Sequence, residues 1–298
     1  MTGEAGHRPD EVPRSDDVRS DAARLREEVG HLRAQLRSKP VISYAQGLLQ
    51  ERYGLADAET AFTLLRQSSQ RFNIKLRVLA EAVVRAPRPE SPKGLWFPGR
   101  VRQAPPSLDV LGLADADHVN RSEVLAAVLS QALVITGTGM GNVQTADRDA
   151  HGLRIERHVG LSEDFVSFFA FVGESGTSCA RAARDLEQTT VHDVATDPVF
   201  TPSARHAILA AGSRACHSVP LVDEEGACKG IVSAHLERPT PDLHPAQLKA
   251  LGATGQQVGR WLTWHERTVV LDALEHLHAT GRLTGTPHPP PQRRRQLE

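Results

Sequence analysis

The chain has 298 residues, of which 40% are hydrophobic, and a formal net charge of −1 at pH 7. This length predicts about two domains, and the balanced charge excludes a protein that binds nucleic acid or a membrane with its whole surface. The first residues lack an apolar signal segment, the apolar run over residues 124–137 is too short to cross a bilayer, and the three cysteines cannot all pair, so we expect a cytoplasmic protein without a disulfide framework.

The first predicted elements are a polar, disordered leader over residues 1–15 and a coiled-coil helix over residues 16–38. Apolar residues recur in the second segment in alternating steps of four and three: Val18, Ala22, Leu25, Val29, Leu32 and Leu36. This a/d spacing over three heptads is typical of a dimeric coiled coil. A single solvated helix lying on its own protein is the alternative. We favour the coiled coil, and therefore a homodimer, because the next segment is also helical and small.

Residues 39–86 are expected to form three short helices in a basic bundle. Gly54 is suited to end the first helix, Asp57 to cap the second and Asn73 to cap the third. The segment holds seven Lys or Arg residues and four Asp or Glu residues, a net charge of about +3. These cations either solvate a surface or bind a polyanion, and the residue types alone do not decide between the two.

Two proline-rich segments, the linker over residues 87–106 and the tail over residues 281–298, show neither helical nor strand periodicity. Trp96 and Phe97, within the linker, are candidates for docking on a neighbouring domain. The tail is also rich in arginine, and we expect it to be disordered.

Residues 107–280 mix the two periodicities. A helical pattern over residues 118–136 precedes short strands, residues 213–222 and 226–237 form a predicted hairpin, and a long helix over residues 245–278 closes the unit. Strands with helices at both ends indicate an antiparallel α+β domain. The expected fold is therefore multidomain: an all-α N-terminal part, made of the coiled-coil helix and the three-helix bundle, followed by an α+β domain with an antiparallel sheet.

Short motifs follow one another through the bundle in a fixed order. Ala45 and Gly47 form an Ala-x-Gly motif, Ala61–Phe62 an Ala-aromatic step and Leu65–Arg66 a Leu-Arg pair. The run "SQRFNIKL" at residues 69–76 and a later alanine complete the series. In this order and spacing, residues 38–86 resemble the ANTAR domain, the RNA-binding module of bacterial transcription antiterminators. The resemblance implies a three-helix bundle that dimerises through a preceding helix and binds paired stem-loops in an mRNA leader.

The resemblance also implies which residues contact RNA. They are Ala45, Gln46, Gly47, Arg66, Ser69, Arg71, Asn73 and Lys75. Small residues allow an RNA backbone to come close, and cations and amides donate hydrogen bonds to phosphates and bases. The family often has a lysine in the middle of the Ala-x-Gly motif, where this chain has Gln46. That position therefore lacks a cation but can still donate hydrogen bonds.

The second unit carries another set of motifs: "VHDVATDPVF" at residues 191–200, "AGSRACHSVPL" at 211–221, "GACKGIVS" at 226–233 and "GTSCARAARD" at 176–185. With these motifs, residues 107–268 resemble a GAF domain, a sensory fold with a six-stranded antiparallel sheet. Domains of this family host cyclic nucleotides, small metabolites, haem, bilins or nothing, so the resemblance names no cofactor. It implies a candidate small-molecule pocket at Cys179, Phe200, His206, Ser218 and His235.

Single residues give less support to a specific cofactor, redox, metal or catalytic role. Cys216 and His217 are neighbours in one strand, so one should face the core and the other solvent, and a packed cysteine is favoured over a bilin or haem site. Cys179 opens a helix and could sense redox state, although a small buried residue is the favoured reading. His192, His206 and His235 lack the spacing of metal ligands, and no catalytic motif is present. We therefore expect no enzyme.

Together these patterns predict an RNA-binding transcription antitermination regulator whose GAF-like domain senses a signal and modulates binding to mRNA leader hairpins. The alternative is a GAF-based small-molecule or redox sensor that acts through protein partners, with the bundle serving only dimerisation.

Overall fold

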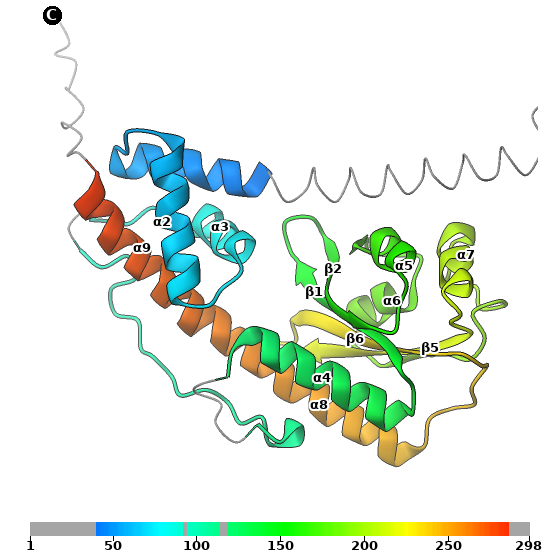
Figure 1. Cartoon of the computed structure of the whole chain (residues 1–298). Helices are drawn as coiled ribbons and strands as arrows, with labels where there is room; N and C mark the ends of the chain where they lie inside the picture. Colours follow the sequence, from blue (N-terminus) through cyan, green and yellow to red (C-terminus); the bar gives the residue numbers. More distant parts are fainter. Residues whose placement is uncertain (1–39, 92–93, 114–118, 286–298) are drawn as a thin grey trace, which may run out of the picture.

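The computed structural model describes residues 40–91, 94–113 and 119–285, which form two lobes joined by one long helix (Figure 1). The expected leader and coiled coil, and residues 286–298 of the expected tail, lie outside these ranges. The expectation that the tail is disordered from residue 281 is wrong for its first residues, since residues 281–284 are helical. The N-terminal lobe is a helical bundle, and the C-terminal lobe is a six-stranded sheet with helices on both faces. The expected multidomain fold is confirmed.

The bundle begins with a helix described over residues 40–53, followed by α2 (Ala58–Arg71) and α3 (Leu76–Arg85). Asp57 caps α2 as expected, since its Oδ1 accepts the backbone N–H of Thr60 at 2.7 Å. Its hydrogen bonds to Thr60 lower the pKa of the Asp57 carboxyl. The second helix therefore starts where its sequence signal predicts.

The expected cap on α3 is wrong. Asn73 adopts a left-handed backbone conformation with φ of 50°, and Lys75 takes the N-cap position without a side-chain hydrogen bond. The chain closes the end of α2 by a backbone hydrogen bond of 2.9 Å from the Ile74 N–H to the Ser69 carbonyl. Asn73 serves this tight turn because asparagine tolerates the left-handed region better than most residues.

Helix α9 (Leu271–Thr284) completes the bundle. Its buried side chains share one core with the three N-terminal helices; this core includes Ala45, Leu49, Leu65, Leu79, Val83, Ala273, Leu274 and Leu277. Residues 107–280 were expected to form the α+β unit, but α9 packs on the bundle instead. The C-terminal helix supplies the apolar surface that three short helices lack.

Helix α8 (Pro245–His265) runs into α9 through a π-helical turn, Glu266–Val270, so that one helix leaves the sheet and enters the bundle (Figure 1). Glu266 in this turn pairs with the buried Lys229 at 2.6 Å. Single π-helical turns inside α-helices often occur at functional positions. The two lobes therefore share a continuous backbone element in addition to the linker.

The proline-rich linker is anchored on α9, which confirms the expected docking of Trp96 and Phe97. The indole of Trp96 is buried, and its N–H donates to the Pro87 carbonyl at 2.8 Å. The backbone N–H groups of Trp96 and Phe97 donate to the two carboxylate oxygens of Glu275, at 2.9 and 2.7 Å. The guanidinium of Arg52 lies over the Trp96 ring, 4.6 Å from its centroid. Trp96 thus bridges the first helix, the linker and α9.

The sheet has the strand order β3-β2-β1-β6-β5-β4, and every neighbouring pair is antiparallel. The strands are β1 (Met140–Asp147), β2 (Gly152–Val159), β3 (Phe171–Val172), β4 (Thr189–Val191), β5 (Ala215–Val222) and β6 (Cys228–Leu236). Helices α4 (Arg121–Thr136) and α8 cover one face. Helices α5 (Glu163–Phe168), α6 (Ser178–Asp185) and α7 (Pro202–Ala210) cover the other. A 3-10 turn, Asp109–Leu111, precedes α4.

Strand β5 shows why both faces of the sheet are buried. Cys216 faces the α5–α7 side and is packed, as expected. His217 points to the opposite side but is only 1% exposed, so the expectation that it meets solvent is wrong. Its ring nitrogens lie 2.9 Å from Thr190 Oγ1 and 2.9 Å from Gln188 Oε1. The second face is closed because β5 packs against α8.

Two glycines let α8 lie directly on the backbone of β5. A Cβ added at Gly255 would lie 2.5 Å from the Pro220 carbonyl oxygen, and one added at Gly259 would clash with the backbone of Val222. We expect Gly259→Ala to lower the free energy of unfolding by about 1–3 kcal/mol, because the helix would have to move off the strand. Urea unfolding measures this loss. Gly47→Ala is the matched control, because a Cβ there meets nothing within 4 Å; a similar loss in the control would contradict the packing argument.

Candidate nucleic-acid interface

The Ala-x-Gly motif lies on the first helix with its three residues in different environments. Ala45 is fully buried in the bundle core. Gln46 is half-buried, and its Nε2 donates to the Ala58 carbonyl at 3.0 Å. Gly47 is exposed, and a Cβ added to it would meet open space. Gly47 therefore offers bare backbone to a partner, while Ala45 acts through packing.

The turn between α2 and α3 carries the other sequence-predicted residues. Ser69 is buried, and its Oγ donates to the Ile74 carbonyl at 2.5 Å, so it holds the turn rather than facing outward. Arg71 and Asn73 are exposed beside it. Arg66, one turn earlier on α2, is exposed as well. The C-terminal part of α2 and the turn after it thus present two arginines and one asparagine to solvent.

The eight predicted residues do not form a single compact patch. Gln46 contacts the first residue of α2, whereas Arg71 is its last residue. Thirteen helical steps separate Ala58 from Arg71, which corresponds to about 20 Å at 1.5 Å per residue. A ligand that reaches both ends must itself be extended, as a nucleic-acid stem-loop is.

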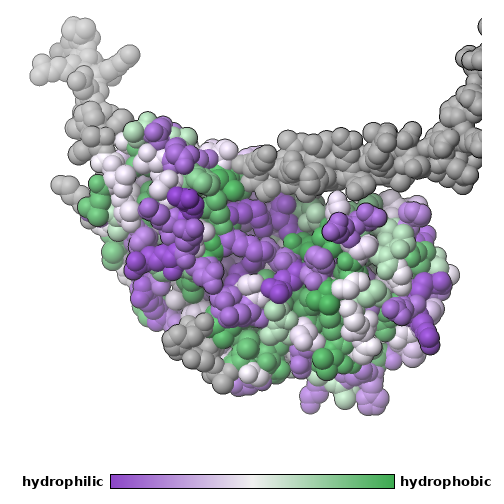
Figure 2. All heavy atoms as spheres, viewed as in Figure 1, coloured by the Kyte–Doolittle hydropathy of each residue, from purple (hydrophilic) through white to green (hydrophobic). Residues whose placement is uncertain are grey.

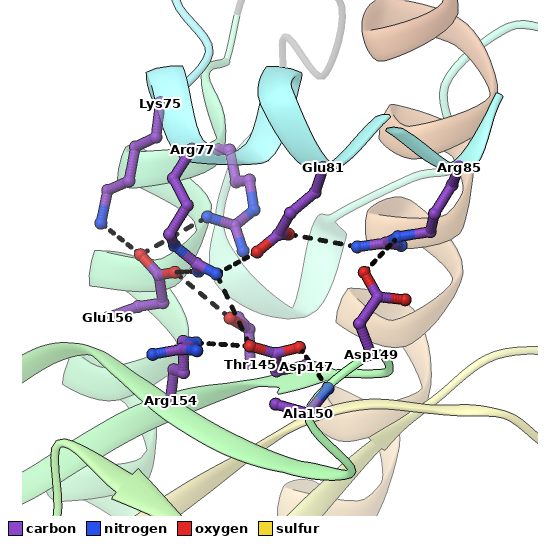
Figure 3. Close-up of polar contacts among 11 residues, drawn as sticks. Lys75, Arg77, Glu81, Arg85, Thr145, Asp147, Asp149, Ala150, Arg154 and Glu156 are labelled. Carbon is purple, nitrogen blue, oxygen red and sulfur yellow. Dashed lines mark hydrogen bonds and ion pairs between the residues drawn. The ribbon is translucent and has the colours of Figure 1, made fainter. Parts of the chain in front are cut away.

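Lys75 is engaged with the other lobe. Its ammonium pairs with the carboxylate of Glu156 on β2, and Arg77 of α3 reaches the same carboxylate at 3.4 Å (Figure 3). Burial raises the pKa of Glu156, but the cations Arg121, Lys75 and Arg77 outweigh this effect and hold that pKa below its usual range. Sequence reasoning missed this acidic partner, since no local pattern links residues 81 positions apart.

Hydrophilic side chains gather over α2, α3 and their junction with the sheet, as Figure 2 shows. Arg66 and Arg71 of α2 and Asn73 after it are exposed. Cations that pair with carboxylates of the sheet, as Lys75 and Arg77 do, are not available to a polyanion in this arrangement.

The candidate small-molecule residues of the second lobe lie in several places. Cys179 and Phe200 belong to the apolar core beneath α5–α7, and His206 is exposed on α7. Ser218 is fully buried, with its Oγ 2.9 Å from Ser233 Oγ. His235 is buried and its Nδ1 lies 3.0 Å from Ser213 Oγ. Four of the five therefore lie on the side of the sheet that α5–α7 cover, and His206 does not join them.

Burial raises the pKa of the Cys179 thiol and raises that of Cys216 to about 12. A thiol held protonated is a poor nucleophile, which supports the packing role of both cysteines over a redox role. In the described ranges, no group of three or more His, Cys, Asp or Glu side chains is placed to hold a metal ion.

A cavity of about 570 Å³ opens elsewhere, beside the turn between β1 and β2. Its lining includes Asp147, Arg148, His151, Leu153, Glu174, Arg184 and Cys228. None of the five candidate pocket residues lines it. A second hollow, of about 510 Å³, lies between β5 and α8 and is likewise lined by other residues.

No helix in the described part of the chain is both long and apolar enough to span a membrane.

Two family models match the chain: the ANTAR domain at residues 30–84 and the GAF domain at residues 118–263. A comparison with curated proteins gives no match. Among solved structures, the GAF domain from a phosphoenolpyruvate-protein phosphotransferase of Coxiella burnetii is 12% identical, with a TM-score of 0.44, 54% of this chain covered and 94% of that chain. Free methionine-R-sulfoxide reductase from Neisseria meningitidis is 16% identical, with a TM-score of 0.40 and coverages of 57% and 99%. The GAF domain/HD domain protein from Geobacter sulfurreducens is 18% identical, with a TM-score of 0.40 and coverages of 52% and 95%.

The two matched segments fall in different lobes. The first spans the bundle up to α3, and the second spans α4 to α8 with the whole sheet. The chain therefore contains an ANTAR domain followed by a GAF domain.

Proposed function

We propose that this protein is an RNA-binding regulator of transcription antitermination whose GAF domain senses a signal. ANTAR and GAF domains are regulatory and sensory rather than catalytic. The observation that carries the proposal is the exposed set on the ANTAR domain: bare backbone at Gly47 on one side, and Arg66, Arg71 and Asn73 on the other. Small residues let an RNA backbone come close, and exposed donors up to about 20 Å along α2 from Ala58 can reach further phosphates or bases.

The partners we propose are tandem stem-loops in an mRNA leader, held by a homodimer. A dimer would present two ANTAR domains to two stem-loops, so that each binding event raises the effective concentration for the other. The GAF domain would take a small-molecule ligand. Its signal can reach the RNA-binding surface through α8 and α9, because α9 belongs to the core of the ANTAR bundle.

RNA titration of the full chain tests this function. We expect tight binding to an RNA with two stem-loops, measured by fluorescence anisotropy, and weaker binding when the loop bases are scrambled. Arg71→Ala should weaken binding and reduce the slope of log K against log salt by about one, because one phosphate contact is lost. Lys249→Ala is the matched control, an exposed cation on α8 far from the bundle.

The opposite result would be equally informative. Binding that ignores loop sequence and does not change in Arg71→Ala would contradict RNA recognition by this domain. The ANTAR bundle would then serve dimerisation, and the protein would be a small-molecule or redox sensor that acts through protein partners.

A further inference from the structure

Helix α3 turns a cationic face toward the GAF domain. Arg77, Glu81 and Arg85 follow one another at intervals of four residues and therefore share one side of the helix. Glu81 pairs with both arginines, which fixes their guanidinium groups along this side. With Lys75 at the start of the helix, three cations line the contact (Figure 3).

The GAF domain meets this face with three carboxylates, which we call the acidic hairpin: Asp147 at the end of β1, Asp149 in the turn and Glu156 on β2. Asp147 Oδ2 lies 3.8 Å from Arg77 Nη1, and Asp149 Oδ2 lies 3.1 Å from Arg85 Nε. Asp147 also pairs with Arg154 of its own hairpin, at 2.5 Å, so Glu156 and Asp149 make the closer contacts with the cations of α3.

Glu156 is the centre of the contact. Its side chain is 3% exposed, yet it accepts from cations of both domains. Oε2 meets the ammonium of Lys75 and, at 3.6 Å, Arg121 Nη1 of α4, while Oε1 lies 3.4 Å from Arg77 Nη2 and 3.3 Å from Thr145 Oγ1. A buried carboxylate surrounded by several donors presents the same acceptor chemistry as a phosphate oxygen.

We propose that the acidic hairpin is an intramolecular competitor of RNA: it occupies Lys75 and the cationic face of α3, and RNA gains these cations only when the hairpin releases them. The proposal rests on the RNA-binding function proposed above. An RNA phosphate brought to Lys75 in the present arrangement would meet the carboxylate of Glu156 on the same ammonium, and two like charges at that distance repel. The arrangement described here is thus the closed state of the regulator.

The helix that joins the two domains contains a place where they can separate. Helix α9 is fixed to the bundle and α8 to the sheet, and the π-helical turn Glu266–Val270 lies between them. A change of direction in this turn would separate α3 from the acidic hairpin without unfolding either domain. Signal transfer then means a shift in the fraction of open molecules.

Glu156→Gln in the full chain is the first test. It removes the central charge but leaves every residue of the predicted RNA set unchanged. We expect the apparent Kd for the two-stem-loop RNA to fall about tenfold, because the apparent Kd equals the intrinsic value divided by the open fraction. Asp242→Asn is the matched control, since it removes one exposed carboxylate at the far side of the GAF domain and should leave the Kd unchanged.

A charge exchange tests the contact itself. Arg85 and Asp149 are both partly exposed and neither belongs to the predicted RNA set, so their variants should fold. Asp149→Arg breaks this pair alone, whereas Arg85→Asp also breaks the pair between Arg85 and Glu81. We expect each single reversal to open the molecule, in addition to its direct effect on RNA. The double variant restores the pair. If the two single effects were independent, their changes in the free energy of binding would add in the double variant. We expect the double variant to bind RNA several-fold more weakly than that sum, because the restored pair closes the molecule again.

The outcomes separate the two proposals. If the wild type binds RNA but Glu156→Gln binds with the same Kd and the charge exchange is additive, the competition is overturned and the RNA-binding function stands. If no form binds RNA, including Glu156→Gln, both are overturned. If Glu156→Gln does not fold, which its thermal unfolding would show, the charge exchange decides.

Discussion

Leu277→Ala is expected to lower the free energy of unfolding by about 2–5 kcal/mol, the usual cost of truncating a fully buried leucine. Leu277 is 0% exposed and sits among the core side chains that α9 shares with the ANTAR helices. Its loss should act mainly on the bundle, because no residue of the GAF core shares this cluster. We therefore expect the bundle to unfold at a lower urea concentration than the sheet.

Tryptophan fluorescence can follow the unfolding of each domain separately, because Trp96 lies in the bundle core and Trp261 in the GAF core. A variant that keeps one tryptophan at a time would report each domain separately by fluorescence. Leu283→Ala is the matched control: it removes the same atoms from the same helix at a side chain that is 89% exposed, and should change stability by less than about 0.5 kcal/mol. Equal losses in the free energy of unfolding for both variants would contradict the stabilisation of α9 by its packing on the bundle.

Local signals in the sequence were sufficient for most elements. Asp57 followed by a helical pattern marks the start of α2, and the hairpin formed by β5 and β6 follows from two apolar runs around a polar turn. Both depend on residues within a few positions of one another, so periodicity and capping contain the necessary information. The fold class and the ANTAR and GAF domains could be predicted for the same reason.

The errors arise where distant segments meet. The sequence of α9 continues the pattern of α8, and nothing local shows that its apolar side packs against Leu49 and Leu79 instead of the sheet. Asn73 has the residue type of a cap, yet the turn after α2 takes it into the left-handed region. His217 alternates correctly with Cys216, but the helix that buries it begins nearly thirty residues later. Tertiary packing decided each of these cases.

The candidate interface shows the same limit. The sequence names Lys75 as an RNA contact and gives no reason to associate it with Glu156. Opposite charges far apart in a chain are common, and only the fold selects which of them pair. The contact between α3 and the sheet was therefore beyond the reach of the sequence, although every residue in it is visible there.

Stability should fall steeply as the pH falls from about 6.5 toward 4. Burial lowers the pKa of His217 and His235 to about 4 each and that of His265 to about 3. Between these values and about 6.5 the unfolded chain binds protons on these rings and the folded chain does not. Each histidine then lowers the free energy of unfolding by up to about 1.4 kcal/mol for each unit of pH, and the contribution is complete above about pH 6.5.

The window from pH 6.5 to 5 separates this effect from the carboxylates. The lowered pKa values of Asp147 and Glu156 cost stability only where unfolded carboxyl groups take up protons, below about pH 4.5. Urea unfolding at several pH values should therefore give a slope of about 4 kcal/mol per unit near pH 5 for three buried histidines. A flat profile in this window would contradict neutral histidines in the folded GAF domain.

His217→Gln tests one ring without removing its polar neighbours. We expect it to reduce the slope by about 1.4 kcal/mol per pH unit, because one titrating group is gone. Thr190→Val is the matched control: it deletes the hydroxyl that lies 2.9 Å from His217 Nδ1 but keeps the imidazole. The control should lower stability at every pH and retain the slope, since a hydrogen bond contributes to stability over the whole range whereas a change in proton binding contributes only in the window where the two states differ.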